Sequence, residues 1–265
     1  MEAETRDSND KICGQDNHES TFYSKAAQYW AQIPPTIDGM LGGFGMISQT
    51  DIAGSEKFLK LIYKWPDPPG KQTALDCGAG IGRITRCLLQ KHFEVVDLVE
   101  QNPLFLDEAK KSLESCPRIG SYYPIGLQSF EPESNKYDVI WCQWVLGHLT
   151  DDDFVKFFES CKKGLRSNGI IIVKENMSGG DVEKDDQDSS VTRPMQVFKE
   201  LLHKAGLKLL LNHRQRKFPQ CLYEVRMLAL RPTFCLEGKD ASGSLHEKAL
   251  RKQSEECSES KLNED

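Results

Sequence analysis

A glycine-rich stretch in the first half of the chain is the sequence feature with the clearest chemical meaning. Residues 74–83 read ALDCGAGIGR, with glycines at 78, 80 and 82 between an apolar run and a helical pattern. Glycine lets the backbone turn tightly and approach a ligand closely. The first N–H groups of a helix have no intrahelical partner and are free to bind one. The stretch therefore predicts a ligand-binding turn at a helix N-terminus.

Two common nucleotide-binding motifs do not fit this stretch. The dinucleotide fingerprint G-x-G-x-x-G requires glycine where Arg83 stands, and a P-loop would end in Gly-Lys-Ser or Gly-Lys-Thr. The remaining pattern, D-x-G-x-G-x-G, is the glycine signature of class I S-adenosylmethionine (SAM) methyltransferases. We therefore interpret the stretch as part of a SAM site.

Polar residues farther along the chain fit the same ligand. Glu100 ends the next apolar segment, 24 residues after Asp76, where a carboxylate can accept both hydroxyls of a ribose. The Arg83 guanidinium suits the methionine carboxylate, and residues 126–128 are placed to frame the adenine. The predicted cofactor residues are Gly78, Gly80, Arg83, Glu100, Gln101, Asn102, Leu127, Gln128 and Gln143.

The surrounding elements follow from hydrophobic periodicity. Residues 22–33 have helical spacing and end at Pro34-Pro35, a loop with four glycines covers 38–48, and a helix capped by Ser55 is expected over 55–63. Strands and helices then alternate, which predicts an α/β fold. We expect a Rossmann-like, mostly parallel seven-stranded sheet with helices on both faces and an N-terminal helical extension. The expected strands are 73–76, 94–99, 139–142, 170–173, 208–211 and 223–230, and the helices 84–90, 103–114, 152–165 and 194–205.

Charge and composition divide the chain of 265 residues into three parts. The formal net charge is −6, but residues 1–21 carry −4 and residues 236–265 carry −3, which leaves +1 for residues 22–235. Both ends have too few apolar side chains to offset the entropy of ordering, so we predict disordered tails. Residues 22–235 are predicted to form one domain, in which 22–65 is the substrate-binding extension.

Several classes of protein are disfavoured by the same composition. No apolar run approaches the roughly 18 residues of a membrane span, and the acidic N-terminus does not resemble a secretory signal. The acidic balance does not favour nucleic acid as a partner. The nine cysteines are scattered, odd in number and without C-x-x-C spacing, which predicts neither a disulfide framework nor a metal site. We expect an intracellular, soluble protein.

Six segments together resemble one known family, the α-N-terminal protein methyltransferases. They are FYSKAAQYW (22–30), IPPTIDGMLGGFGMIS (33–48), ALDCGAGIGRIT (74–85), YDVIWCQWVLGHLTD (137–151), GIIIVKEN (169–176) and DQDSSVTR (186–193). The resemblance covers residues 22–232. It implies transfer of methyl groups from SAM to the free α-amine of proteins that begin Xaa-Pro-Lys or Xaa-Pro-Arg once the initiator Met is removed. It also implies chromatin-associated and ribosomal substrates, and a location in nucleus and cytoplasm.

The resemblance also assigns roles to individual residues. Asp188 and His148 would accept the proton, while Asn176 and Ser190 would orient the nitrogen. Trp144 would face the methylated ammonium, because an aromatic ring attracts a cation without accepting a proton. The slot for the second-position proline would consist of Leu41, Ile47 and Leu222, with Trp30, Gly42 and Tyr223 beside it; Asp185 and Asp188 would meet the third-residue Lys or Arg.

Some features leave alternatives open. Taken alone, Trp30 fits core packing and the acids of 181–188 fit a solvated loop. Glu175 and Glu100 stand where the family typically has Asp, and the sequence fixes neither the number of methyl groups added nor the oligomeric state. A small-molecule methyltransferase would have the same SAM site, and a non-catalytic SAM-binding adaptor would use the N-terminal helices for docking. An adenine methyltransferase of nucleic acids is disfavoured, since no Asn/Asp-Pro-Pro-aromatic motif follows residues 139–142.

Overall fold

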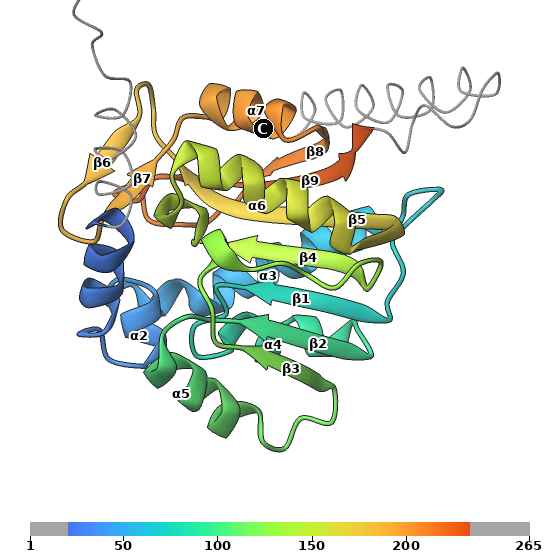
Figure 1. Cartoon of the computed structure of the whole chain (residues 1–265), viewed down its shortest axis with the longest axis horizontal. Helices are drawn as coiled ribbons and strands as arrows, with labels where there is room; N and C mark the ends of the chain where they lie inside the picture. The colour runs from blue at the N-terminus through green and yellow to red at the C-terminus, as the bar shows by residue number, and fades with distance from the viewer. Residues whose placement is uncertain (1–20, 234–265) are drawn as a thin grey trace, which may run out of the picture. The chain divides into compact units, whose positions relative to one another are not determined.

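The core of the protein is one seven-stranded sheet. The computed structural model describes residues 21–233, so the predicted tails lie outside the described residues apart from residue 21. The strands run in the order β3-β2-β1-β4-β5-β9-β8, as Figure 1 shows. Their bounds are Thr73–Cys77 for β1, Val95–Val99 for β2, Ile119–Tyr123 for β3, Tyr137–Gln143 for β4, Leu165–Met177 for β5, Leu207–Arg214 for β8 and Glu224–Pro232 for β9.

The sheet is mostly parallel, as the sequence predicts. Strand β1 pairs in parallel with both β2 and β4, and β4 pairs in parallel with β5. Every residue of β1 and β4 is buried, which is typical of strands covered on both faces. Strand β9 runs antiparallel to β5, with Ile171 opposite Leu230 and Met177 opposite Glu224.

Helices cover both faces of the sheet. On one face, α6 (Asp151–Gly164) and α7 (Met195–Lys204) bury Phe154, Phe158 and Phe198 against β4 and β5. On the other face lie α3 (Ser48–Ile62), α4 (Arg83–Cys87) and α5 (Pro103–Leu113). Thr150 caps α6, and the negative charges of three aspartates in its first turn interact favourably with the positive end of the helix dipole.

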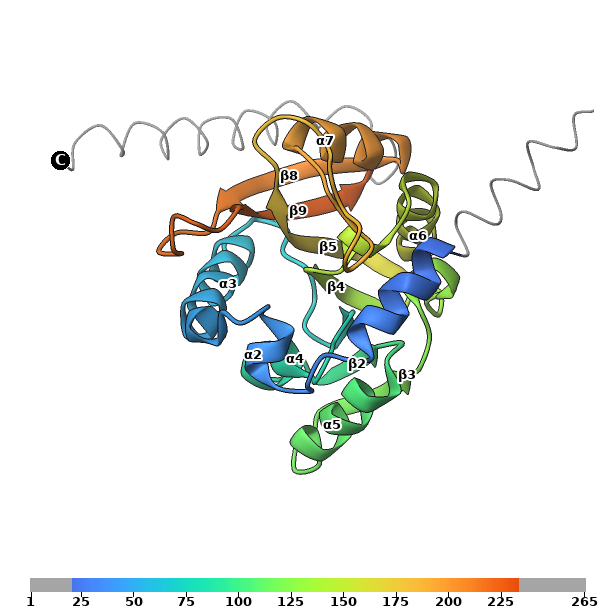
Figure 2. The same cartoon turned by 90° about the vertical axis from the view of Figure 1, so that its left-hand side faces the viewer.

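The N-terminal extension packs on the sheet domain through specific polar contacts. It comprises a helix over residues 21–30, the short helix α2 (Ile37–Met40), a 3₁₀ turn (Gly45–Ile47) and α3. The first helix lies beside α6 and the β6–β7 hairpin in both views (Figure 2). The Tyr23 hydroxyl donates to Asp153 of α6 at 2.5 Å, and α2 is capped by Thr36. The expected helical extension is therefore present.

Several expected boundaries are wrong. The helix expected to begin at Ser55 begins at Ser48, and Ser55 is a buried residue inside it whose hydroxyl accepts a hydrogen bond from Lys174. The helix expected over 84–90 ends at Cys87 and continues as a 3₁₀ turn. Strand β3 and the hairpin of β6 (Glu183–Asp185) and β7 (Ser190–Thr192) were not predicted, because their residues lack clear alternation.

The remaining sequence expectations concern cysteines and membranes. Among the described cysteines, Cys77, Cys142 and Cys161 are buried, and Cys221 is exposed; all six in this part of the chain are free thiols. Burial raises the pKa of the Cys77 and Cys161 thiols. No helix within residues 21–233 is long and apolar enough to cross a membrane.

Candidate active site

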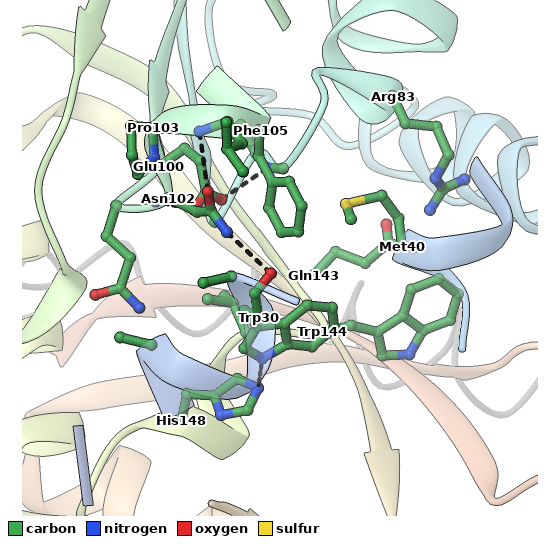
Figure 3. A pocket seen from close by; sticks show the side chains of 18 of the residues that line it. Trp30, Met40, Arg83, Glu100, Asn102, Pro103, Phe105, Gln143, Trp144 and His148 are labelled. Atoms are coloured by element: carbon green, nitrogen blue, oxygen red, sulfur yellow. Dashed lines mark hydrogen bonds between the residues drawn. The ribbon is translucent and has the colours of Figure 1, made fainter. Parts of the chain in front are cut away.

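A cavity lies at the carboxyl ends of β1, β2 and β4. The chain leaves β1 for β2 and β3 on one side and returns to β4 on the other, so the loops after these strands separate around a crevice. The cavity has a volume of about 280 Å³ (Figure 3). A smaller pocket continues from it and shares Gly78, Glu100 and Gln101 with it. This is the region where open α/β sheets bind their ligands.

The glycine turn borders this cavity. Gly78 and Gly80 have φ values of 67° and 55°, in the left-handed region that favours glycine. A Cβ atom on Gly78 would lie 2.4 Å from a methyl carbon of Val145, so a side chain there would displace the loop after β4. The turn therefore needs glycine both for its backbone conformation and for its packing.

Glu100 organises the turn and the loop that follows β2. One carboxylate oxygen accepts the Gly80 N–H at 2.9 Å, and the other accepts the Asn102 N–H at 2.7 Å. Burial raises the pKa of Glu100, while these backbone N–H groups lower it. A carboxylate has about four lone-pair positions, so both oxygens retain capacity for the hydroxyls of a ribose.

Arg83, at the start of α4, and Gln143, at the end of β4, both contact Asp51 of α3. An Arg83 guanidinium nitrogen lies 2.7 Å from the Asp51 carboxylate, and the Gln143 amide donates to both oxygens at 2.9 and 3.0 Å. The Arg83 guanidinium also lies 5.7 Å from the centre of the Trp144 ring. Asp51 was not predicted as a site residue, because only the fold brings α3 next to β4.

The residues around the cavity fit SAM. Glu100 offers a carboxylate for a ribose, Arg83 a guanidinium for a carboxylate, and Pro103, Leu104 and Phe105 an apolar wall. All nine predicted cofactor residues line the cavity or the smaller pocket that continues from it, and Leu127 and Gln128 line the smaller pocket. The wall after Asn102 and the lining residues Ala27, Ala31 and Met40 of the N-terminal extension were not predicted, whereas Trp30 of the same extension was predicted as a substrate residue.

His148 stands where the cavity meets the N-terminal helix. The Trp30 indole N–H donates to His148 Nε2 at 2.9 Å, and His148 Nδ1 lies 3.3 Å from the Ser189 carbonyl oxygen (Figure 3). Burial lowers the pKa of His148, although the nearby Asp188 carboxylate raises it. A neutral imidazole that donates from Nδ1 and accepts at Nε2 satisfies both contacts. Both ring nitrogens are thus engaged.

Within residues 21–233, two buried polar atoms of the predicted substrate residues lack a hydrogen-bond partner. They are the Oδ1 atom of Asp188 and the indole nitrogen of Trp144. Trp144 and Ser189, the residue after Asp188, both have positive φ values, 52° and 56°. Such conformations cost about 1–3 kcal/mol each in a residue with a side chain and cluster at functional sites. An unpaired carboxylate oxygen with one neighbour in a strained conformation is suited to a ligand that donates hydrogen bonds.

The segment that carries His148 is fixed from both sides. Glu175 accepts the N–H groups of Val145 and Leu146 at 2.7 and 2.9 Å, and burial raises the pKa of Glu175 to about 7. Arg193 donates to the carbonyl oxygens of Leu146 and Leu149. Both residues lie in the sequence motifs that carry the family resemblance, but this supporting role was not predicted for them.

The other predicted substrate residues lie outside the cavity lining. Leu41 and Ile47 are buried, Gly42 has a positive φ value, and Leu222 is half-buried. Asp185 pairs with Ser190 across the β6–β7 hairpin, and Asn176 pairs with Val225 between β5 and β9. The exposed Tyr223 donates its hydroxyl proton to Glu183 at 2.5 Å. Of the predicted substrate and catalytic residues, Trp30, Trp144 and His148 line the cavity, and the roles of all of them stay predictions.

The sheet topology and the residues of the cavity together define a class of protein. Within residues 21–233, no group of three or more His, Cys, Asp or Glu side chains is arranged to hold a metal ion. A mostly parallel seven-stranded sheet, a glycine turn after β1 and an acidic residue after β2 define a class I SAM-dependent methyltransferase.

Comparisons with known proteins identify the family within that class. Residues 18–231 match the family described as AdoMet-dependent proline di-methyltransferase, where AdoMet is SAM, and the chain belongs to this family. The N-terminal Xaa-Pro-Lys N-methyltransferases 1 of mouse and human are each 51% identical over 215 residues, which cover 80% of this chain and 96% of each relative.

Solved structures agree with this assignment. A SAM-dependent methyltransferase from Leishmania major is 40% identical, has a TM-score of 0.75, and aligns over 79% of this chain and 83% of its own. A phosphoethanolamine N-methyltransferase from Haemonchus contortus, at 15% identity, has a TM-score of 0.62 over 88% of this chain and 52% of its own, which shows a shared fold. The predicted fold class, enzyme class and cofactor are confirmed.

Proposed function

We propose that this enzyme methylates the free α-amino group of proteins that begin Xaa-Pro-Lys or Xaa-Pro-Arg. The structural observation that carries the proposal is the buried, unpartnered carboxylate oxygen of Asp188, which acts on His148, a residue of the cavity lining. A carboxylate there attracts an ammonium group, the charged form of the substrate amine. The names of the mouse and human relatives support the same substrate class.

SAM, when bound, supplies a methyl group on a positively charged sulfur, which a neutral amine can attack. An α-amine has a pKa of about 7.7–8.0, so a useful neutral fraction exists near neutral pH without a strong base. The carboxylate of Asp188 favours the ammonium form and therefore raises the amine pKa. Asp188 consequently serves first to position the amine and second to accept its proton.

The surroundings of Asp188 favour productive alignment of the amine. His148 has both ring nitrogens engaged, so Asp188 is the acceptor with an unused position in this arrangement. Proton acceptance by His148 would require the Trp30 indole to move away. The Trp144 ring faces a cation without competing for the proton, and Glu175 and Arg193 fix the backbone that follows it.

The residues that follow the proline belong to the same proposal. Asp185 on the exposed β6 strand and Asp188 offer negative charge for a third-residue Lys or Arg. The buried Leu41 and Ile47 offer apolar surface for a proline, which has no N–H to satisfy. Chromatin-associated and ribosomal substrates, and a location in nucleus and cytoplasm, stay predictions from the family resemblance.

Mass spectrometry tests the proposal directly. The full chain is incubated with SAM and a peptide that begins Ser-Pro-Lys, beside an N-acetylated copy and a copy that begins Ser-Ala-Lys. We expect mass gains of one or more methyl groups on the free Pro peptide, little on the Ala peptide and none on the acetylated one. Methylation of the blocked peptide, or of none of the three, would contradict an α-amine substrate. The number of mass steps gives the degree of methylation.

A further inference from the structure

A buried charged cluster lies behind the cofactor cavity. The Asp51 carboxylate of α3 contacts Arg83 at 2.7 Å and the Lys174 ammonium of β5 at 2.6 Å. The Asp51 and Lys174 side chains are 0% exposed, and that of Arg83 is 6% exposed. Arg83 opens α4 and lines the cavity, whereas Lys174 does not line it. The cluster therefore connects the cofactor site to the N-terminal extension.

Hydrogen bonds fix the position of Lys174. Its ammonium donates to the Asp51 carbonyl oxygen and the Ser55 hydroxyl, each at 3.0 Å, and to the Gln215 side-chain oxygen at 2.8 Å. These three acceptors are uncharged, so Asp51 is the anion that lies in direct contact with Lys174. Burial lowers the pKa of Lys174, as does the nearby Arg83, while Asp51 raises it. The contact of 2.6 Å with a carboxylate is consistent with a charged ammonium.

The charges in this cluster are unequal. Two cations, Arg83 and Lys174, share the single carboxylate of Asp51. Asp76 acts on Arg83 at longer range, and its carboxylate is occupied by the hydroxyl and N–H of Thr85. Because Lys174 already offsets the charge of Asp51, the positive charge of Arg83 is incompletely compensated by its direct contacts. An uncompensated buried charge is costly, and an anion in the cavity would relieve that cost.

We propose that Lys174 is a positioning residue for the cofactor: it engages Asp51, so that the charge of Arg83 is available to the carboxylate of the methionine moiety of SAM. Without Lys174, Asp51 would pair with Arg83 alone, and the guanidinium would attract a second carboxylate less strongly. The proposal depends on the SAM-dependent class of the enzyme and is independent of the protein substrate. It assigns a cofactor-binding function to a side chain outside the cavity.

Two ligands that differ in the relevant group test the proposal. S-adenosylhomocysteine carries the amino-acid carboxylate, whereas 5′-methylthioadenosine has the same adenosine and thioether but a methyl group in place of the amino-acid chain, so it lacks this carboxylate together with the α-ammonium group. We measure the affinity of both for the full chain and for Lys174→Met by calorimetry, in the absence of peptide. We expect affinity for S-adenosylhomocysteine to fall about tenfold or more, and affinity for 5′-methylthioadenosine to change less than twofold. A thermal unfolding scan checks that the variant is folded.

Two further variants complete the test. Lys174→Gln removes the charge but keeps a hydrogen-bond donor, and the same loss confined to S-adenosylhomocysteine is expected if the methionine variant does not fold. Lys57→Met, an exposed position on α3, should leave both affinities unchanged. An equal loss for both ligands would mean that Lys174 only supports the fold, and no loss for either would mean that Arg83 does not depend on it. Either result would overturn the proposal. Since no peptide is present, failure of the methylation proposal would not affect this outcome.

Discussion

The cofactor side and the substrate side of the cavity differ in how their polar groups are paired. On the cofactor side, Glu100, Arg83 and Gln143 all bond to other parts of the protein. On the substrate side, Asp188 and Trp144 each leave a buried polar atom without a partner. The cofactor side is thus preorganised by its own hydrogen bonds, whereas the substrate side is completed by its ligand. Loss of a side chain on the cofactor side should therefore lower cofactor affinity. Loss of a side chain on the substrate side should lower the rate of methylation.

The largest effect is expected at Asp188. Asp188→Asn removes the charge that positions the amine and should lower the rate of peptide methylation by about 100-fold or more. The affinity for S-adenosylhomocysteine should stay nearly unchanged, because Asp188 does not line the cofactor cavity. Single-turnover kinetics and calorimetry measure the two quantities. The exposed Asp186→Asn, on the same hairpin, is the control, and parallel losses of rate and affinity would show a structural role instead.

The opposite pattern is expected at Glu100. Glu100→Gln removes the charged acceptor for Gly80 and Asn102 and for the ribose, so cofactor affinity should fall roughly 10- to 100-fold. The rate at saturating SAM should fall much less. Glu94→Gln, an exposed acid at the start of the same βα unit, should have no effect. A variant with normal affinity and a low maximal rate would contradict the division between the two sides.

Glu175 fixes the backbone of the segment that carries His148, and the pH dependence of protein stability tests this role. Burial raises its pKa from 4.5 to about 7 in the folded state. Between these values the unfolded chain releases the proton while the folded protein retains it, so stability should fall as pH rises. From pH 5 to pH 8 this group should cost about 2 kcal/mol of unfolding free energy. Urea unfolding should show that loss in the parent protein and not in Glu175→Gln, and identical pH profiles would refute it.

The smallest effect is expected at Trp30. Trp30→Phe keeps an aromatic ring but removes the N–H donated to His148, which costs about 1 kcal/mol, or roughly fivefold in rate. The indole N–H binds the neutral imidazole, so its removal should raise the pKa of His148. NMR titration of His148 measures that shift, with Tyr29→Phe as the control. A lower pKa in the variant would mean that the indole does not set the state of His148.

The two sides also differ in how far the sequence predicts them. The cofactor residues directly follow strands with strong apolar patterns, so Gly78, Glu100 and Gln143 could be placed from the sequence and the order of elements. Their partner Asp51 could not, because it lies 92 residues from Gln143 in the chain. Ser55 was interpreted as a helix cap for the same reason, since its partner Lys174 is 119 residues away.

The residues of the substrate side were predicted from the family resemblance and not from local sequence patterns. The β6–β7 hairpin has exposed, charged residues without alternation, so nothing in the local sequence predicted its pairing. The left-handed conformation of Ser189 and the contacts of Arg193 with the His148 segment result from tertiary packing. Local patterns predict elements, whereas these features arise only when distant elements meet.

Trp30 belongs to both sides. Its carbonyl oxygen accepts the Asn102 side-chain amide at 3.0 Å beside the cofactor turn, and its indole donates to His148 beside the substrate residues. A ligand that stabilises one of these bonds also fixes the residue that makes the other. Thermodynamic linkage then requires reciprocity: whatever factor SAM contributes to peptide affinity, the peptide contributes to SAM affinity. One residue of the N-terminal helix, through its backbone carbonyl and its side chain, thereby joins two binding equilibria.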